Sequence, residues 1–308
     1  MDALAIPILL AVGSLLALQA AANVQLSAAT GSPFGASTLQ LGIGASVLLA
    51  AGAVAGALGA LALLDDSPAW HLVGGLGSSL YITSGILLFP RLGALLTVGL
   101  WIAGQMLASL VLDGFGWLGV EQDVPGLAQL AGALAVVAGA VVIVRTQAGA
   151  DAIGRAVRER TGWIALGVVA GAALPVQGAI NAQLRADLDA PLAAGAVSFV
   201  VATAGMAALL ATVLALGAPR PRLEPLRGLP WWGWLGGLVG AVYVTSVFLL
   251  IPEIGTAPTI ALTVAGQQLA SVLVDRYGLL RLPARPVGRT RLIAVAVLLT
   301  GVMLITLI

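Results

Sequence analysis

The 308-residue sequence contains no cysteine, no lysine and a single histidine, His71. The absence of cysteine excludes disulfides, thiol catalysis and thiolate-bound metals, and the absence of lysine excludes Schiff-base chemistry. One histidine cannot form a cluster of imidazole ligands, and the sequence contains no nucleophile–base pair, phosphate-binding loop or metal-ligand spacing. We therefore expect no enzymatic activity, no metal and no cofactor.

Charged residues are scarce as well. They make up 9% of the chain, against 60% hydrophobic residues, and the mean hydropathy is +1.07. A soluble domain carries about 25% charged residues, whereas a bilayer protein needs polar groups only in loops and internal cavities. The net charge of +1 leaves no basic field for nucleic acid. We expect a protein whose main surroundings are the lipid bilayer and which binds no nucleic acid.

Long apolar runs make up most of the chain. A transmembrane helix needs about 20 mostly apolar residues, and ten runs meet this requirement. The predicted spans cover residues 4–26, 36–63, 70–89, 93–112, 126–144, 162–184, 193–217, 231–251, 257–275 and 290–308. No positive charge precedes the first run, so we expect it to be a span rather than a cleavable signal. The predicted fold class is an all-α polytopic membrane protein with ten transmembrane helices.

The two halves of the chain resemble each other. Three polar motifs occur once in each half: Gln-x-x-x-Asn-x-Gln-Leu at 19–26 and 177–184, Tyr-x-Thr-Ser at 81–84 and 243–246, and Gly-Gln-x-Leu-Ala-Ser at 104–109 and 266–271. A composition rich in Ala, Gly and Leu does not produce paired Gln, Asn and Tyr at fixed offsets. The sequence therefore predicts a five-helix repeat over 1–149, a cytoplasmic linker over 150–158 and a second five-helix repeat over 159–308.

The second repeat is expected to be inverted, because five spans per half make it enter the membrane from the opposite side. Arginine supports this prediction, since cytoplasmic connections carry the excess of positive charge. Thirteen of the 14 arginines fall on the side that holds the linker, and only Arg185 falls on the other. We expect the linker inside the cell and both termini outside.

Polar residues recur every fourth position in the fourth and ninth spans. The rows include Gln105, Ser109 and Asp113 in the fourth span and Gln267, Ser271 and Asp275 in the ninth. Residues four apart share a helix face, and such a row is costly in hydrocarbon unless it faces protein or water. Two interpretations stay open: the rows line the path of a polar solute, or they form hydrogen bonds between helices. A serine can also bond to the preceding turn of its own helix.

Further polar residues lie inside other spans. They are the amide pairs Gln19–Asn23 and Gln177–Asn181 and the tyrosines Tyr81 and Tyr243. Amides four residues apart share a helix face and can hold a polar ligand or lock helix packing. A tyrosine in mid-span, away from the interfacial belt, can line a cavity or bond to a neighbouring helix.

No carboxylate lies in the middle of a predicted span. Asp113 and Asp275 end the two polar rows, and Glu253 follows Pro252 at the end of a span. One interpretation is that they are solvated charges at helix ends. The other is that they form a gate or couple transport to protons.

The motif Pro-Val-Gln-x-x-Ile-Asn-x-x-Leu over 175–184 is followed by Pro191 and Ser198, and Gly-Gly-x-x-x-Ala-x-Tyr-x-Thr-Ser covers 236–246. In these residues the sequence resembles the YdcZ-type family of the drug/metabolite transporter superfamily, in its fused two-repeat form. The resemblance covers essentially the whole chain, although the first half has Gln40 where the second has Ser198. It implies a ten-helix inverted-repeat transporter of the prokaryotic inner membrane, with a cavity between the halves.

We expect this chain to move a small polar, neutral or zwitterionic organic solute by alternating access. Amides, hydroxyls and tyrosines can bind such a solute without a buried counter-ion. The alternatives are a flippase for a lipid-linked carrier and a membrane scaffold that transports nothing. Because one chain holds both repeats, we expect it to contain the whole path as a single chain, which is also compatible with a dimer.

Overall fold

The computed structural model describes residues 5–148, 153–254 and 256–306 of the chain. Within these ranges every regular element is a helix. The α-helices are α1 (Ala5–Thr30), α2 (Pro33–Val54), α3 (Leu76–Leu92), α4 (Ala94–Phe115), α5 (Leu127–Ala148), α6 (Ile153–Leu188), α7 (Pro191–Ala215), α8 (Leu235–Ile254), α9 (Thr256–Tyr277) and α10 (Arg289–Thr306). Short 3-10 helices join them: η1 (Ala57–Asp66), η2 (Ala69–Gly75), η3 (Trp117–Gly119), η4 (Glu224–Gly228), η5 (Trp231–Trp234) and η6 (Leu279–Arg281).

Seven helical stretches in the described residues are long and apolar enough to cross a bilayer. They overlap the first seven predicted spans, from Ala5–Thr30 to Pro191–Ala215. The last three predicted spans correspond to α8, α9 and α10, for which crossing the bilayer stays a prediction. Much of the expected linker over 150–158 belongs to α6, which begins at Ile153, and residues 149–152 lie outside the described part.

The second span is shorter than the sequence predicted. A single helix was expected over 36–63, but α2 ends at Val54 and the chain continues as η1. The break falls at Gly56, whose φ of +70° is left-handed and suits a residue without a Cβ. The expectation of one long span over 36–63 is therefore wrong, because apolar composition continued past a point where the backbone turns.

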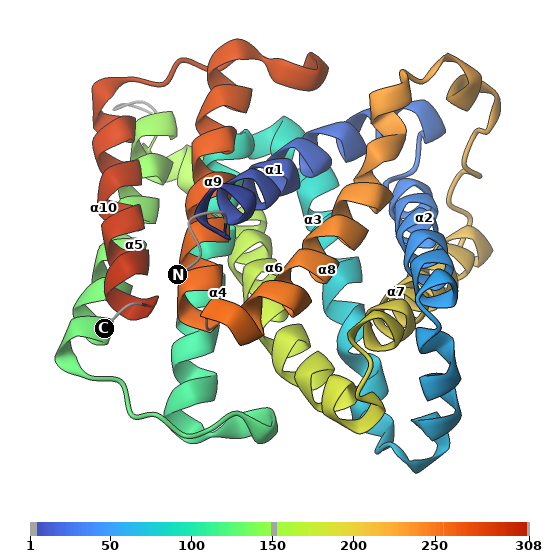
Figure 1. Cartoon of the computed structure of the whole chain (residues 1–308). Helices are drawn as coiled ribbons and strands as arrows, with labels where there is room; N and C mark the ends of the chain where they lie inside the picture. The colour runs from blue at the N-terminus through green and yellow to red at the C-terminus, as the bar shows by residue number, and fades with distance from the viewer. Residues whose placement is uncertain (1–4, 149–152, 255, 307–308) are drawn as a thin grey trace.

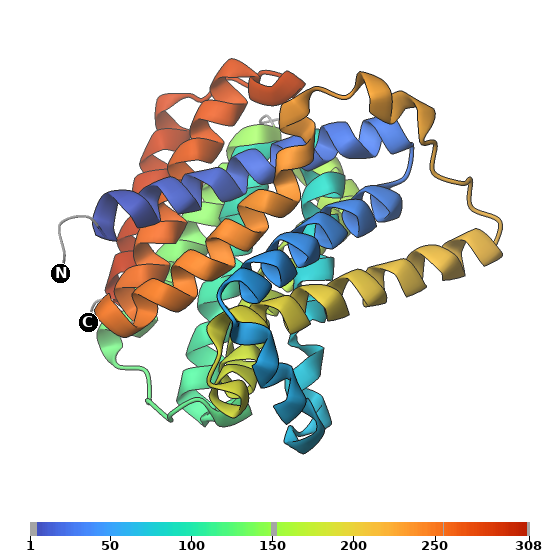
Figure 2. The same ribbon diagram turned by 45° about the vertical axis from the view of Figure 1, so that its right-hand side comes forward.

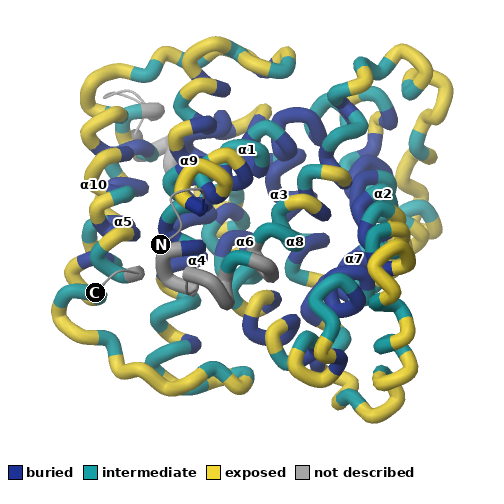
Figure 3. The backbone as a smooth tube through the Cα atoms, in the orientation of Figure 1, coloured by how far each residue is buried: buried dark blue, intermediate teal, exposed yellow. Residues whose placement is uncertain are grey.

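Helices of the two halves interleave. In the first half α1 packs against α8 and α9, and its counterpart α6 packs against α3 and α4 of the first half. The helices α2 and α7 pack against each other, as do α5 and α10, which run side by side in Figures 1 and 2. Figure 3 shows buried residues gathered where α1, α3, α4 and α6 meet, and exposed residues along α5, α10 and the connections.

Glycines bring these helices into close contact at equivalent positions. Gly13 of α1 lies against the backbone of Thr263 in α9, and Gly171 of α6 lies against the backbone of Trp101 in α4. A Cβ at either glycine would overlap the facing backbone atoms. Small residues serve this purpose at interfaces between membrane helices. The two contacts are equivalent: in one a glycine of the first half meets a helix of the second half, and in the other a glycine of the second half meets a helix of the first.

Acidic and basic connections lie at opposite ends of the bundle. Figure 1 shows the α7–α8 and α9–α10 connections at one end and the α4–α5 connection and η1 at the other. The first two contain Arg220, Arg222, Arg227, Arg281 and Arg285. The opposite end carries Asp65, Asp66, Glu121 and Asp123. That the basic end faces the cytoplasm stays a prediction.

Candidate functional site

A buried polar contact joins the two halves near the centre of the molecule. The Nε2 atom of Gln267 in α9 donates a hydrogen bond to the hydroxyl of Tyr81 in α3, at 2.5 Å. Both side chains are buried. A buried polar group costs free energy unless it is hydrogen-bonded. This contact therefore satisfies both groups and connects α3 to α9.

Aromatic packing fixes the position of Tyr81. Its ring lies 4.2 Å from the ring of Trp101, which is fully buried. The Nε1 atom of Trp101 donates to the hydroxyl of Ser84 at 3.0 Å, and that hydroxyl donates to the carbonyl of Tyr81 at 2.7 Å. The tyrosine hydroxyl is thus held in place to accept the hydrogen bond from α9.

The equivalent contact in the opposite direction is not formed. It would join Gln105 of α4 to Tyr243 of α8. The Nε2 atom of Gln105 is buried and has no hydrogen-bond partner, and Tyr243 is half-buried with no hydrogen bond to any described residue. In the second half Thr263 occupies the position of Trp101, so no indole ring packs behind the second tyrosine. The site is therefore asymmetric although its residues repeat.

The paired glutamines of α1 and α6 link these helices to the opposite half. The Nε2 atom of Gln19 donates to the carbonyl of Gly236 at 2.8 Å. The amide of Gln177 and the hydroxyl of Ser78 are hydrogen-bonded at 2.8 and 2.9 Å. All four groups are buried. In this conformation both glutamine amides form contacts between helices.

The paired asparagines each use one amide group within their own half. Asn23 donates from Nδ2 to Gln40 at 2.7 Å, and Asn181 donates from Nδ2 to the hydroxyl of Ser198 at 3.0 Å. The Oδ1 atoms of both asparagines and the Nε2 atom of Gln40 are buried without partners. Each Oδ1 lies against a glycine of the other half, where only a weak C–H···O contact can form. In this conformation the hydrogen-bonding capacity of these atoms is unused.

The two serines of the polar rows differ. Ser271 is buried and donates to the carbonyl of Gln268 in its own helix at 2.6 Å. Ser109 is half-buried and has no hydrogen bond to any described residue. The self-bonding alternative therefore describes Ser271, and Ser109 keeps a free hydroxyl.

Asp275 caps the helix of the other half. Its carboxylate accepts hydrogen bonds from the backbone N–H groups of Ala94 at 2.7 Å and Leu95 at 3.0 Å. These are among the unpaired donors at the start of α4, where a negative charge also complements the helix dipole. Only 2% of Asp275 is exposed. Its interpretation as a solvated helix-end charge is therefore wrong, because the tertiary fold places α4 over it.

The other two acidic candidates are less enclosed or less defined. Asp113 is half-buried, and its backbone carbonyl accepts from the N–H of Asp123 at 2.8 Å. The carbonyl of Asp275 accepts in the same way from Arg285 at 2.6 Å, so the two turns are alike. Glu253 belongs to α8, and its side chain lies outside the described residues.

Two polar groups of the interior were missed by the sequence analysis. His71 of η2 pairs with Asp187 near the end of α6, with 2.5 Å between Nδ1 and Oδ2. Gln268 is fully buried, and neither amide atom has a partner. The pairing of His71 with Asp187, 116 positions apart, could not be predicted from residue spacing. The polar residue Gln268, in contrast, could have been noticed by comparing the two halves. Its counterpart in the first half is the apolar Met106.

The described residues contain no group of three or more His, Asp or Glu side chains that could hold a metal ion. The ion pair between the described side chains of His71 and Asp187 links η2 to α6, and the fully buried side-chain atoms without a partner belong to amides. The arrangement can therefore donate and accept hydrogen bonds in an apolar interior.

The sequence matches a protein family described as "Putative inner membrane exporter, YdcZ", over residues 4–142 and again over 162–304. The two matched stretches correspond to the two halves recognised from the repeated motifs. Curated protein sequences give no match. A solved structure described as "Crystal structure of protein" is 21% identical, with a TM-score of 0.57 over 97% of each chain. That similarity shows a shared fold.

Proposed function

Because the chain belongs to the YdcZ family of the drug/metabolite transporter superfamily, we propose that it exports a small polar, neutral or zwitterionic organic solute by alternating access. Membership makes it a multi-pass inner-membrane protein of a transporter family rather than of an enzyme family. In the proposed mechanism the two five-helix repeats are inverted and rock about a site between them.

The observation that carries the proposal is the unequal state of two equivalent contacts. Gln267 is bonded to Tyr81, whereas Gln105 and Tyr243 are not bonded to each other. An inverted repeat can exist in two conformations in which the halves exchange their arrangements. In the second conformation Gln105 would bond to Tyr243, and the contact between α3 and α9 would open.

The unpaired buried atoms support the proposed solute class. Gln105 and Gln40 each present a buried N–H₂ group without an acceptor, and Asn23 and Asn181 each present a buried oxygen without a donor. A neutral or zwitterionic molecule that carries donors and acceptors satisfies these atoms and removes the cost of burying them. We place the solute among the polar residues that the repeats bring to the interior. They are Gln19, Asn23, Tyr81, Gln105, Ser109, Gln177, Asn181, Tyr243, Gln267 and Ser271.

Asp275 is proposed as a gate residue. Its two hydrogen bonds to the start of α4 hold the ends of α9 and α4 together. A rocking motion that separates these helices has to release the carboxylate. Asp113 occupies the equivalent position on α4, and we propose that it caps α9 in the second conformation.

A thermal-shift screen of the purified protein tests the function. A panel of soluble metabolites should contain at least one compound that raises the melting temperature. That shift should be lost in Gln105→Ala and retained in Gln122→Ala, a change of an exposed glutamine in the α4–α5 connection. Stabilisation only by lipid-linked sugars would instead indicate a flippase. No stabilisation by any compound would indicate a scaffold, and either result overturns the proposal.

A further inference from the structure

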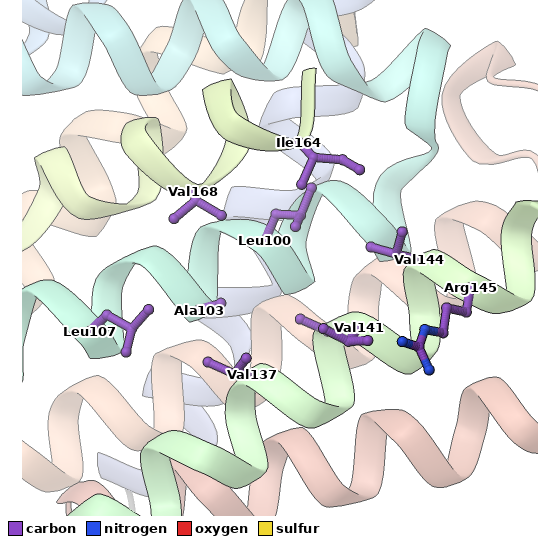
Figure 4. Close-up of a pocket in the computed structure, with 10 residues that line it drawn as sticks. Leu100, Ala103, Leu107, Val137, Val141, Val144, Arg145, Ile164 and Val168 are labelled. Atoms are coloured by element: carbon purple, nitrogen blue, oxygen red, sulfur yellow. The ribbon is translucent and has the colours of Figure 1, made fainter. Parts of the chain in front are cut away.

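An apolar crevice lies away from the polar centre, between α4, α5 and α6. It encloses about 520 Å³, and Figure 4 shows its aliphatic walls. They include Leu100 and Leu107 of α4, Val137 and Val141 of α5, and Val168 of α6. Residues 137 to 144 of α5 follow its length, which corresponds to roughly 10 Å at 1.5 Å per residue. The crevice therefore suits an elongated apolar group rather than the polar solute proposed above.

One end of the crevice is positively charged. Arg145, in the last turn of α5, is the single charged residue among those that line it, and in Figure 4 it lies at the end opposite Leu107. Arg145 is exposed and forms no salt bridge with a described carboxylate. A second guanidinium group lies near, because Arg291 donates to the carbonyl of Thr146 at 3.2 Å. Among the described side chains, none forms an ion pair with Arg145, so its guanidinium can bind an anion at this end.

The crevice opens toward the surroundings of the bundle. Two of its wall residues, Leu107 and Val141, are 39% and 40% exposed, and the neighbouring Leu134 of α5 is 73% exposed. Exposed aliphatic side chains on a membrane-spanning helix contact acyl chains. The charged end lies on the side predicted to be cytoplasmic, where basic pockets between transmembrane helices bind anionic lipid head groups.

We propose that this crevice binds one anionic phospholipid. One of its two acyl chains lies along the aliphatic walls, and its phosphate group pairs with Arg145, whose planar guanidinium matches a phosphate. Phosphatidylglycerol has the required chemistry, and zwitterionic phosphatidylcholine, whose net charge is zero, is the matched comparison. The inference is independent of the solute site, because the crevice shares none of the proposed solute-binding residues.

Native mass spectrometry of delipidated protein tests the head-group half of the proposal. After incubation with equal amounts of phosphatidylglycerol and phosphatidylcholine, one phosphatidylglycerol should remain per chain. Arg145→Gln should lower this preference about five-fold, the factor expected for one basic residue at a membrane surface. Arg227→Gln changes an exposed arginine of η4 outside the crevice and should leave the preference unchanged. An equal preference in Arg145→Gln and the parent protein would overturn the proposal.

A second pair of variants tests the acyl-chain half. Val141→Trp places a large ring over the crevice and should reduce retention of phosphatidylglycerol. Leu134→Trp adds the same ring to α5 outside the crevice and should not. Both positions are exposed, so the melting temperatures should stay within a few degrees of the parent. Unchanged retention in a folded Val141→Trp protein would place the lipid elsewhere and contradict the inference.

Discussion

The side-chain amide of Gln267 donates its hydrogen bond to the hydroxyl of Tyr81, across a distance of 186 positions in the sequence. The residues equivalent to this pair, Gln105 and Tyr243, are not hydrogen-bonded to each other. The difference is supported locally by Trp101, which packs against Tyr81 and has Thr263 as its counterpart in the second half. The glutamine–tyrosine hydrogen bond is thus formed once, although the residues for a second, equivalent bond are present.

Removing the hydroxyl of Tyr81 should destabilise the conformation described here. Tyr81→Phe leaves the amide of Gln267 buried without an acceptor, which costs about 1–3 kcal/mol. The matched control is Tyr243→Phe, which breaks no hydrogen bond in this conformation and should change stability by less than about 0.5 kcal/mol. Equilibrium unfolding in detergent measures both values.

The same two variants should shift the conformational equilibrium in opposite directions. The hydrogen bond from Gln183 to the carbonyl of Gly119 joins α6 to the connection after α4. Cysteines introduced nearby, at the exposed positions Gln122 and Ala186, would report on the separation of these two segments, and the chain has no cysteine of its own to react. Tyr81→Phe favours the second conformation and Tyr243→Phe the present one, so the cross-linking rate should change with opposite sign. A change of equal sign in both would refute the exchange of contacts.

Replacing the unpaired amide in α9 should stabilise the protein. Gln268→Met introduces the residue found at the equivalent position of α4, with similar volume and no unpaired amide. Relief of the unpaired groups should raise the free energy of unfolding by about 1–3 kcal/mol. The reciprocal change, Met106→Gln, should lower it by a similar amount. A loss of stability in Gln268→Met would mean that the amide is satisfied in the folded protein.

Two glycine substitutions should have effects of opposite sign. Gly13→Ala forces a Cβ into the backbone of Thr263 and should cost about 1–3 kcal/mol, since backbone atoms cannot move aside cheaply. Gly178→Ala places a Cβ of α6 in open space and should stabilise the helix by about 0.5–1 kcal/mol. Thermal unfolding of both variants checks the close approach of α1 to α9, and equal effects would argue against it.

Removing the carboxylate of Asp275 should weaken the start of α4. Asp275→Ala leaves the N–H groups of Ala94 and Leu95 without acceptors and should cost about 0.5–2 kcal/mol. Asp275→Asn keeps one acceptor oxygen, so its loss of stability should be smaller.

Transport measurements on Asp275→Asn and Asp113→Asn distinguish a gating role of these carboxylates from a role in proton coupling. Uptake into vesicles driven by a pH gradient should persist in Asp275→Asn if the carboxylate only caps the helix. Abolished uptake in both Asp275→Asn and Asp113→Asn would assign the carboxylates to proton coupling instead.

Residue spacing was sufficient to locate most helices and the repeat. Apart from the C-terminal end of α2, the first seven spans were predicted within a few residues, because apolar run length and polar loops are local properties of the chain. The end of α2 was misplaced, since Gly56 interrupts the helix without interrupting the hydrophobic composition. The equivalence of Gln105 with Gln267 and of Tyr81 with Tyr243 was also visible in the motifs.

The sequence by itself determined the membrane environment, the helical fold and the two homologous halves. The length of the hydrophobic runs indicates a lipid bilayer as the surroundings, and the repeated motifs indicate that the two halves are similar. Only the tertiary structure decided which repeated residues are paired, that Asp275 is buried under α4, and that His71 meets Asp187. These contacts join helices far apart in the chain. They depend on how closely the glycine-lined helices pack. The spacing of residues along the chain does not specify that packing.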